Sequence, residues 1–360
     1  MVVTTGMTGD YDQHSEFQRR VVESGSSLVA DCVDRLALPE PPAPLVIADL
    51  GAGTGRNSMA ALGRAVSAAR ARRADLPIVC VHADLPTNDW NGLFASLASS
   101  PDSYLRAPGP AALPMAAGRS FFEPVVPRGL AHLEVSFSAA HWLRSAARAA
   151  LPRAAIYFCE ATGAARQALA AQAAADWGAF LRARADDLAA GGRLVVQCVG
   201  TEVGPGGAER VTARETMAAV GEVAAELADE GALSREALDA FVFPVYARTV
   251  AEARAPLNPD GALAAAFEVV DASTAPVPNP YLERWREAGD AAAYARAAVG
   301  FVRGFSESAL RLGLFPGDGG GDTADPVIDE LYARLEARFA TAPERDAFLD
   351  WTLTVVLARR

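Results

Sequence analysis

A short glycine-rich stretch constrains this chain more than any other part of it. Residues 45–58 read LVIADLGAGTGRNS: an apolar run of strand length, a turn with three glycines in five residues, and the start of an Ala-rich helix. Glycine permits the tight turn and lets a ligand approach the backbone, which a Cβ would obstruct. A strand, a glycine turn and a helix form the first unit of a nucleotide-type α/β fold. We therefore predict an α/β fold, with a first strand over 45–50 and a helix over about 56–73.

The glycine spacing bears on which ligand such a turn would hold. The turn reads G-x-G-x-G, and Asp49 lies two residues before its first glycine. The dinucleotide fingerprint is G-x-G-x-x-G instead. An acid at the strand end is typical of S-adenosylmethionine (SAM) methyltransferases, where it contacts the amino-acid part of the cofactor. From this stretch alone, a dinucleotide site and a turn without any ligand stay open as alternatives.

A second acid favours SAM over a dinucleotide. Residues 77–83, PIVCVHA, are predicted as a buried strand, and Asp84 follows at its end. An acid at the end of the second strand bonds ribose hydroxyls in both fold families. The two acids, Asp49 and Asp84, lie 35 positions apart. The dinucleotide fingerprint places its acid only about 20 residues after the glycines.

Charge and composition exclude several classes of function. The formal net charge is −11, which argues against a nucleic-acid ligand because such binding relies on a basic surface. All 33 residues counted as Lys or Arg are Arg. The chain therefore has no Walker-type phosphate loop, Schiff-base lysine or lysine general base. The abundance of Ala, with Arg in place of Lys, indicates a bacterial source of high GC content.

Cysteines and histidines give no pattern of a metal site, and the chain has no pattern of a membrane protein. The four cysteines and four histidines are scattered, without zinc-ligand spacing. No apolar run reaches the roughly 18 residues that a membrane span needs. The N-terminal residues lack the basic and apolar regions of a secretory signal. We therefore expect no metal and a cytoplasmic location.

The remaining pattern predicts a core followed by a cap. Residues 98–130 are rich in Pro, Gly and Ser and are predicted as loop. A helix is predicted over 167–190, ended by two glycines, with a core strand over 193–199. Alternating strands and helices predict a mostly parallel sheet. We expect a Rossmann-like core over 1–200 and a mainly helical cap over 201–360, whose last segment can return to the sheet.

Six stretches of the chain resemble, in order, the motifs of the SABATH family of carboxyl methyltransferases. This family includes the salicylate, benzoate and jasmonate enzymes of plants and the N-methyltransferases of the caffeine pathway. The matching stretches are YDQHSEFQ at 11–18, ADLGAGTGRNS at 48–58, HADLPTNDWNGLF at 82–94, GRSFFEPVVP at 118–127, SFSAAHWL at 136–143 and DWGAFLRARADDLAAGGRLVV at 176–196. The resemblance covers nearly the whole chain and implies a SAM-dependent methyltransferase with a helical cap over its pocket.

The resemblance also implies which residues hold the cofactor. Asp49 would contact the methionine end, Asp84 would bond the ribose, and Leu85 would pack on the adenine. Ser120 and Phe121 would meet the adenine ring. The full cofactor set implied by the matching positions is Tyr11, Ser15, Asp49, Gly51, Gly53, Asn57, Asp84, Leu85, Ser120, Phe121 and Ser136.

For the substrate, the resemblance implies that Gln18 and Trp142 bond its carboxylate, with His141 and Tyr11 lining the pocket. A glutamine amide and an indole N–H are neutral donors, so they orient an anion without a strong ion pair. A carboxylate is ionised at neutral pH, so its methylation needs no general base. One departure from the family pattern leaves the identity of the acid open: Ser138 stands where a pocket tyrosine is common.

The predicted function is SAM-dependent methylation of a small aromatic or apolar carboxylic acid to its methyl ester. Two alternatives remain, N-methylation of a heteroaromatic small molecule and a non-catalytic SAM-binding partner protein. An NAD-dependent oxidoreductase with a Tyr-x-x-x-Lys pair is excluded because the chain has no lysine. Since plant members of the family are commonly homodimers, the resemblance implies a homodimer here.

Overall fold

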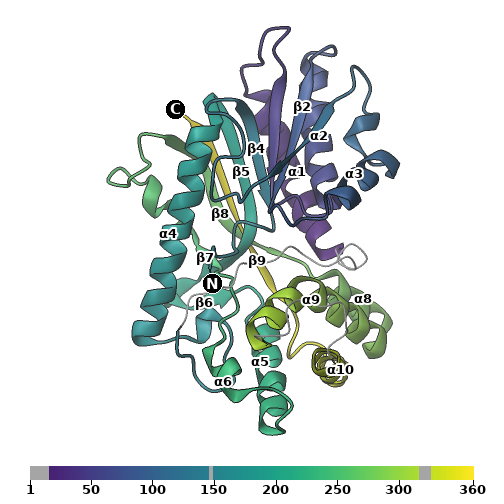
Figure 1. Ribbon diagram of the computed structural model, residues 1–360, viewed down its shortest axis with the longest axis vertical. Helices are drawn as coiled ribbons and strands as arrows, with labels where there is room; N and C mark the ends of the chain where they lie inside the picture. The colour runs from purple at the N-terminus through teal and green to yellow at the C-terminus, as the bar shows by residue number, and fades with distance from the viewer. Residues whose placement is uncertain (1–15, 146–148, 316–325) are drawn as a thin grey trace.

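The computed structural model describes residues 16–145, 149–315 and 326–360 (Figure 1). Its centre is one twisted sheet whose main path contains seven strands. In spatial order these are β3 (Leu113–Gly118), β2 (Ile78–Asp84), β1 (Leu45–Leu50), β4 (Ala131–Phe137), β5 (Leu188–Val203), β9 (Asp350–Arg359) and β8 (Phe267–Val277). Two short strands, β6 (Glu209–Val211) and β7 (Arg248–Thr249), pair with the end of β5.

The sheet is mostly parallel, which confirms the predicted fold class. The strands from β3 to β5 run parallel to one another, whereas β9 is antiparallel to both β5 and β8. All six residues of β1 are buried, as expected for a parallel strand covered on both faces. Its bounds are those predicted from the sequence, and β2 begins at Ile78, one residue later than predicted.

Helices cover both faces of the sheet. On one face lie α1 (Glu16–Asp34), α2 (Arg56–Arg72) and α3 (Trp90–Ser99), and on the other lies α4 (Gly163–Asp187) with the short α7 (Val250–Arg254) (Figure 1). The two faces enclose separate apolar cores. This arrangement places the carboxyl ends of β1, β2 and β4 at a common edge, where ligands bind in open α/β sheets.

Five further helices gather at that edge (Figure 1). They are α5 (Arg214–Asp229), α6 (Arg235–Ala240), α8 (Pro280–Ala288), α9 (Ala291–Leu314) and α10 (Pro326–Thr341). Phe17, at the start of α1, packs into this group: its ring centroid is 5.3 Å from that of Phe301 and 5.2 Å from that of Phe348. The first helix of the described residues, α1, therefore shares one apolar core with α9 and α10.

Two predictions about local structure were wrong. The stretch predicted as loop over 98–130 contains the edge strand β3, together with a 3-10 turn over Tyr104–Arg106. Its sequence LPMAAG lacks strand-forming residues apart from Leu and Met, and both of those, Leu113 and Met115, are exposed. A Pro is tolerated there because an edge strand pairs on one side only.

The predicted helix over 167–190 ends earlier, at Asp187, and β5 begins at the next residue. Pairing with β4 starts at Leu188, is interrupted by a register shift, and resumes at Arg193. The two glycines, Gly191 and Gly192, thus lie within the irregular start of the strand. Among the residues that the structure describes, no helix is both long and apolar enough to cross a membrane.

Candidate functional site

The glycine turn follows β1 directly and leaves open space beside it. Gly51, Gly53 and Gly55 have φ angles of 89°, 53° and 87°, in the region that favours glycine, and α2 begins at the next residue. A Cβ built on Gly53 would meet nothing within 4 Å. A Cβ on Gly51 would lie 2.4 Å from the Cβ of Ala139. The turn therefore packs against the loop after β4 and has an open side at Gly53.

Asp84 and the glycine turn form one hydrogen-bonded assembly. One carboxylate oxygen of Asp84 accepts from the Gly53 N–H at 2.7 Å, and the other accepts from the Leu85 N–H at 2.7 Å. The Asn88 side-chain amide donates to the Gly53 carbonyl at 2.8 Å. Burial raises the pKa of Asp84, and the two backbone hydrogen bonds offset part of that rise. Each carboxylate oxygen keeps a lone pair with which to accept from a ribose hydroxyl.

A buried ion cluster fixes the turn that carries Phe121. Arg184 is fully buried, and its guanidinium donates to the carbonyls of Phe121 and Glu123, each at 2.9 Å. It is also paired with Asp187 at 2.6 Å and with Glu134 at 3.1 Å. Asp187 in turn accepts from the Val125 N–H at 3.0 Å. Arg184 and Asp187 thus hold the segment after β3 through hydrogen bonds to its backbone, at residues 121, 123 and 125.

The residues at this edge fit SAM. The open side of the turn at Gly53 could receive the amino-acid end, next to Asp49, which is 4% exposed at the end of β1. Asp84 lies at the end of the adjacent strand. The ring of Phe121 reaches the turn, since its Cε1 would lie 3.9 Å from a Cβ on Gly51. An aromatic wall and two acids around an open glycine turn suit an adenosine bearing a charged tail.

The remaining predicted cofactor residues have different environments. Ser136 is fully buried, and its hydroxyl donates to the Leu50 carbonyl at 3.0 Å, which ties β4 to β1. Asn57, Leu85 and Ser120 are each half-buried around the carboxyl edge of the sheet. Their roles stay predictions. Tyr11 and Ser15 lie outside the described residues.

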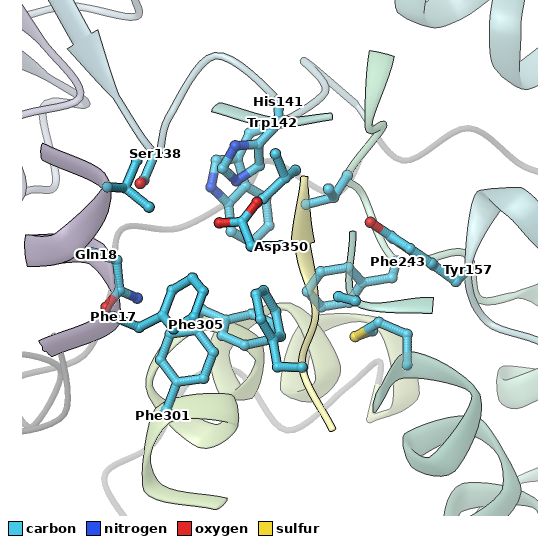
Figure 2. Close-up of a pocket in the computed structure, with 16 residues that line it drawn as sticks. Phe17, Gln18, Ser138, His141, Trp142, Tyr157, Phe243, Phe301, Phe305 and Asp350 are labelled. Carbon is cyan, nitrogen blue, oxygen red and sulfur yellow. The ribbon is translucent and has the colours of Figure 1, made fainter. Parts of the chain in front are cut away.

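A cavity between the sheet edge and the helices α1, α5 and α9 brings together three of the predicted substrate residues (Figure 2). It holds about 570 Å³ of empty space, including its opening to solvent. Gln18 enters from α1, and His141 and Trp142 enter from the segment after β4. The wall is otherwise largely apolar, formed by Phe17, Val21, Val199, Ala213, Met217, Phe243, Val245, Phe301, Phe305 and Phe348, with Ser138, Tyr157 and Asp350 as further polar members.

Gln18 and Trp142 offer donors that the described protein does not use. Gln18 is 6% exposed, and its Oε1, an acceptor, is buried without a hydrogen-bond partner among the described residues. No hydrogen bond of its NH2 group, the donor, is found among those residues either. Figure 2 shows its amide at the cavity. Trp142 is half-buried, and in the same part of the chain no hydrogen bond of its indole N–H is found. An unpaired buried polar atom is costly, so the Gln18 amide at this cavity indicates a place for a polar ligand.

His141 is neutral and held rigidly. Burial, and then the positive charge of Arg248, lower its pKa to about 3. Its carbonyl accepts from the Tyr246 N–H at 3.0 Å, and the next residue pairs with Val245 as an isolated antiparallel bridge. Behind this segment, the buried guanidinium of Arg248 donates to the Ala140 carbonyl at 3.0 Å. The segment that carries His141 and Trp142 is therefore held by backbone hydrogen bonds on both sides.

Sequence reasoning missed several residues of this cavity. Phe301 and Phe305 lie four residues apart on α9, a spacing that predicts one helix face but not what that face covers. Phe348 precedes the strand β9, and Asp350 is the first residue of that strand. No local motif marks either of them, because their place in the wall depends on how the C-terminal segment returns to the sheet.

Comparisons with known proteins agree with this geometry. The model of a family described as SAM-dependent carboxyl methyltransferases matches residues 4–360. O-methyltransferase acrG of Aspergillus aculeatus is 29% identical over 338 residues, which cover 88% of this chain and 85% of that protein. Gibberellic acid methyltransferase 2 of Arabidopsis thaliana is 26% identical over 361 residues, which cover 93% of this chain and 87% of that protein.

A solved structure shares the whole fold. The structure of a loganic acid methyltransferase with SAH superposes with a TM-score of 0.78 at 22% identity, and the match covers 100% of this chain and 99% of that chain. This likeness supports the arrangement of the sheet and of the helices at its edge.

Proposed function

This chain belongs to the family of SAM-dependent carboxyl methyltransferases, as its resemblance to the SABATH enzymes predicted, and we propose that its acceptor is a small carboxylic acid with an apolar or aromatic body. One observation carries this proposal: Gln18 and Trp142 bring a neutral amide, whose buried oxygen has no partner among the described residues, and an indole into a cavity whose walls are mostly aromatic and aliphatic. The relative named for gibberellic acid supports a carboxylic acid as the acceptor.

We propose that the glycine turn, Asp49, Asp84 and Phe121 hold SAM, with the other predicted cofactor residues around them. When bound, SAM supplies a methyl group that its sulfonium has already activated. The residues of the chain on this side bind SAM and orient its methyl group. Asp84 is preorganised for it by the two backbone amides that fix its carboxylate.

On the acceptor side, the residues would bind the acid, orient it and keep water out. The carboxylate is ionised at neutral pH because such groups have pKa values near 4, so no general base is needed. Gln18 and the Trp142 indole would each donate to it. Both donors are neutral, so they fix its direction without stabilising the ground state as strongly as a cation would. The aromatic wall contributed by α9 excludes water from the site.

A transfer assay tests this proposal. The protein is incubated with methyl-labelled SAM and a panel of aromatic and aliphatic carboxylic acids, beside heteroaromatic amines that carry no carboxylate. We expect labelled product from at least one acid, and that product should lose its label in mild base, as a methyl ester does. Label that is stable to base, found only with the amines, would assign N-methylation instead. Binding of SAM without transfer to any acceptor would favour a non-catalytic partner protein.

We further propose a division into a core over 1–200 and a mainly helical cap over 201–360, acting as a cytoplasmic homodimer. The five helices gathered at the sheet edge support the division, although β8 and β9 of the second part belong to the sheet. The resemblance to plant enzymes supports the dimer. Light scattering on the purified protein gives its mass directly, and a value near the 37.6 kDa of one chain would contradict the dimer.

A further inference from the structure

An acid lies in the wall of the otherwise apolar part of the cavity. Asp350 opens β9, is 5% exposed, and lines the same space as Phe305 and Phe348. Figure 2 shows its carboxyl group pointing into the cavity. Because β9 runs antiparallel to β5, the first residue of β9 lies at the carboxyl edge of the parallel strands, where the acceptor would bind.

Among the described residues, the partners of this carboxyl group are hydroxyls, those of Thr212 and Thr352, and not cations. The Thr212 hydroxyl is 3.3 Å from one carboxylate oxygen of Asp350. The same hydroxyl is closer, at 3.0 Å, to the Gly200 carbonyl, and 3.4 Å from the Trp351 carbonyl. A hydroxyl carries a single proton, so three acceptors share one donor. Within the described ranges, no ion pair joins Asp350 to any Arg or His.

Its surroundings penalise an unpaired charge. Burial raises the pKa of Asp350 to about 7, and the hydroxyls of Thr352 and Thr212 offset only part of that rise. A buried carboxylate without a cation is costly unless a ligand or a proton neutralises it. An anionic acceptor in the same cavity would add a second negative charge and increase that cost.

We propose that Asp350 is a specificity residue that receives a hydrogen-bond donor, a hydroxyl or an ammonium group, carried by the acid that is methylated. This inference rests on the proposed function, since it places the donor on the same molecule as the carboxylate bound by Gln18 and Trp142. A donor-bearing acid relieves both penalties at once: it pairs the buried carboxyl group and separates the two like charges.

The pairing would act as a filter between acids. A site built to bond a polar group rejects the analogue that lacks it, because its own buried group is then left without a partner. The apolar wall accepts the body of many acids with little discrimination. Asp350 would therefore select a hydroxy or amino acid from among acids of similar size.

A binding series tests the proposal on the full chain saturated with S-adenosylhomocysteine. The probes are phenylacetate and its ortho, meta and para derivatives with a hydroxyl or an aminomethyl group, titrated by calorimetry. At least one derivative should bind about tenfold or more tightly than phenylacetate itself. That ratio should fall to about one in Asp350→Leu. Glu268→Gln, which changes an exposed acid on the neighbouring strand β8, should leave the ratio as it is in the wild type.

A second variant, Asp350→Asn, preserves the shape of the side chain. It allows the same test if the leucine variant does not fold. An asparagine still accepts a hydrogen bond but cannot pair with a charge. A preference that survives partly in Asp350→Asn assigns a hydroxyl, whereas a preference that disappears assigns an ammonium group.

Two outcomes would overturn the inference, and they are distinguishable. Binding and methylation of phenylacetate, with no preference for any derivative, would refute the role of Asp350 and leave the proposed function intact. A ratio that is unchanged in both Asp350 variants would do the same. Absence of binding and of methylation for every acid would refute the proposed function, and this inference with it.

Discussion

At the scale of single residues, the site depends on polar groups that the described part of the chain pairs only incompletely. Gln18 and Trp142 would donate to the substrate carboxylate, and Asp350 has hydroxyl partners but no ion pair with a cation among the described residues. Each lies in a wall of aromatic rings, where an unmade hydrogen bond costs about 1–3 kcal/mol. No interaction within the described protein offsets that cost. We therefore assign all three side chains to ligand binding.

The first prediction concerns the charge at position 18. Gln18→Glu keeps nearly the same shape but places an anion against the substrate carboxylate. We expect kcat/KM for the acid to fall by about 100-fold or more, because repulsion is added to a lost hydrogen bond. The dissociation constant of S-adenosylhomocysteine should stay within about twofold, since Gln18 lies at the acceptor cavity.

The control is Gln167→Glu, the same change at an exposed position on α4. It should leave both constants at their wild-type values. A variant at position 18 that retains full kcat/KM but loses S-adenosylhomocysteine would reverse our assignment of this residue.

The second prediction follows from the pKa of Asp350, which lies at about 7 in the folded protein and at 3.8 without its surroundings. The folded chain thus holds this proton more tightly, and the stability that the proton provides is present below pH 4 and is lost as the pH rises through 7. Each unit of pKa difference corresponds to about 1.4 kcal/mol. The difference in unfolding free energy, wild type minus Asp350→Asn, should therefore fall between pH 4 and pH 7.

Urea unfolding at several pH values gives this difference. The buried His141 has its pKa lowered to about 3 and so produces the opposite pH slope, but it is present in both proteins and cancels. Parallel pH profiles for the wild type and the variant would show that Asp350 is not the titrating group.

At the scale of elements, the cofactor side consists of two turns held by different means. The side chains of Asp84 and Asn88 fix the glycine turn through hydrogen bonds to its backbone. The turn with Phe121 is fixed by the buried guanidinium of Arg184. The first was predictable from sequence because glycines and acids follow predicted strands at known spacing. The second was not, because Arg184 lies on α4, about 60 residues away, and nothing local marks its contact.

The third prediction separates backbone strain from the ligand cradle. Gly53 and Gly129 both have positive φ, at 53° and 71°, and a Cβ on either would meet nothing within 4 Å. Alanine at either position should destabilise the fold by about 1 kcal/mol, because an L residue is strained there. Only Gly53→Ala should also weaken S-adenosylhomocysteine binding, by about tenfold or more, since its methyl group would point into the cradle. Equal affinities of the two variants would place the cofactor elsewhere.

The fourth prediction concerns Arg184, a positioning residue. Arg184→Met keeps much of the apolar stem but frees the carbonyls of Phe121 and Glu123 and leaves Glu134 and Asp187 without their cation. We expect a loss of about 3–5 kcal/mol in stability, as for a broken buried pair. S-adenosylhomocysteine should bind more weakly in the fraction that is folded, and acid affinity should change less.

The lysine variant serves as its comparison. Arg184→Lys keeps the charge, but an ammonium group cannot reach both acids and both carbonyls at once. Relative to Arg184→Met, it should therefore restore more of the lost stability than of the lost cofactor affinity. Equal recovery of the two would show that the charge alone matters and that the turn needs no support.

At the scale of the whole molecule, the acceptor cavity exists only where distant segments meet. Its walls include residues of α1, of the loop after β4, of β5, of α5, of α9 and of the start of β9. Sequence could predict the core strands and the motif residues, because each is a local pattern. It could not predict that Phe17 packs on Phe301 and Phe348, since that contact depends on how both ends of the chain close over the sheet edge.

The same reasoning explains why the resemblance predicted the reaction class but not the acid. The predicted carboxylate donors lie within the motifs, whereas several residues that shape the rest of the cavity, Phe301, Phe305 and Asp350, lie outside them. The reaction class is therefore readable from local sequence, and the choice of acid is set by tertiary contacts.

The central claim is that SAM binds at the glycine turn while the acid binds in the separate, adjacent cavity. Calorimetric titration of S-adenosylhomocysteine into the wild type, Asp84→Ala and Trp142→Phe tests it most directly. We predict micromolar binding to the wild type, about tenfold or greater loss in Asp84→Ala, and unchanged affinity in Trp142→Phe. Absence of binding to the folded wild type, or a loss in Trp142→Phe with none in Asp84→Ala, would contradict the account.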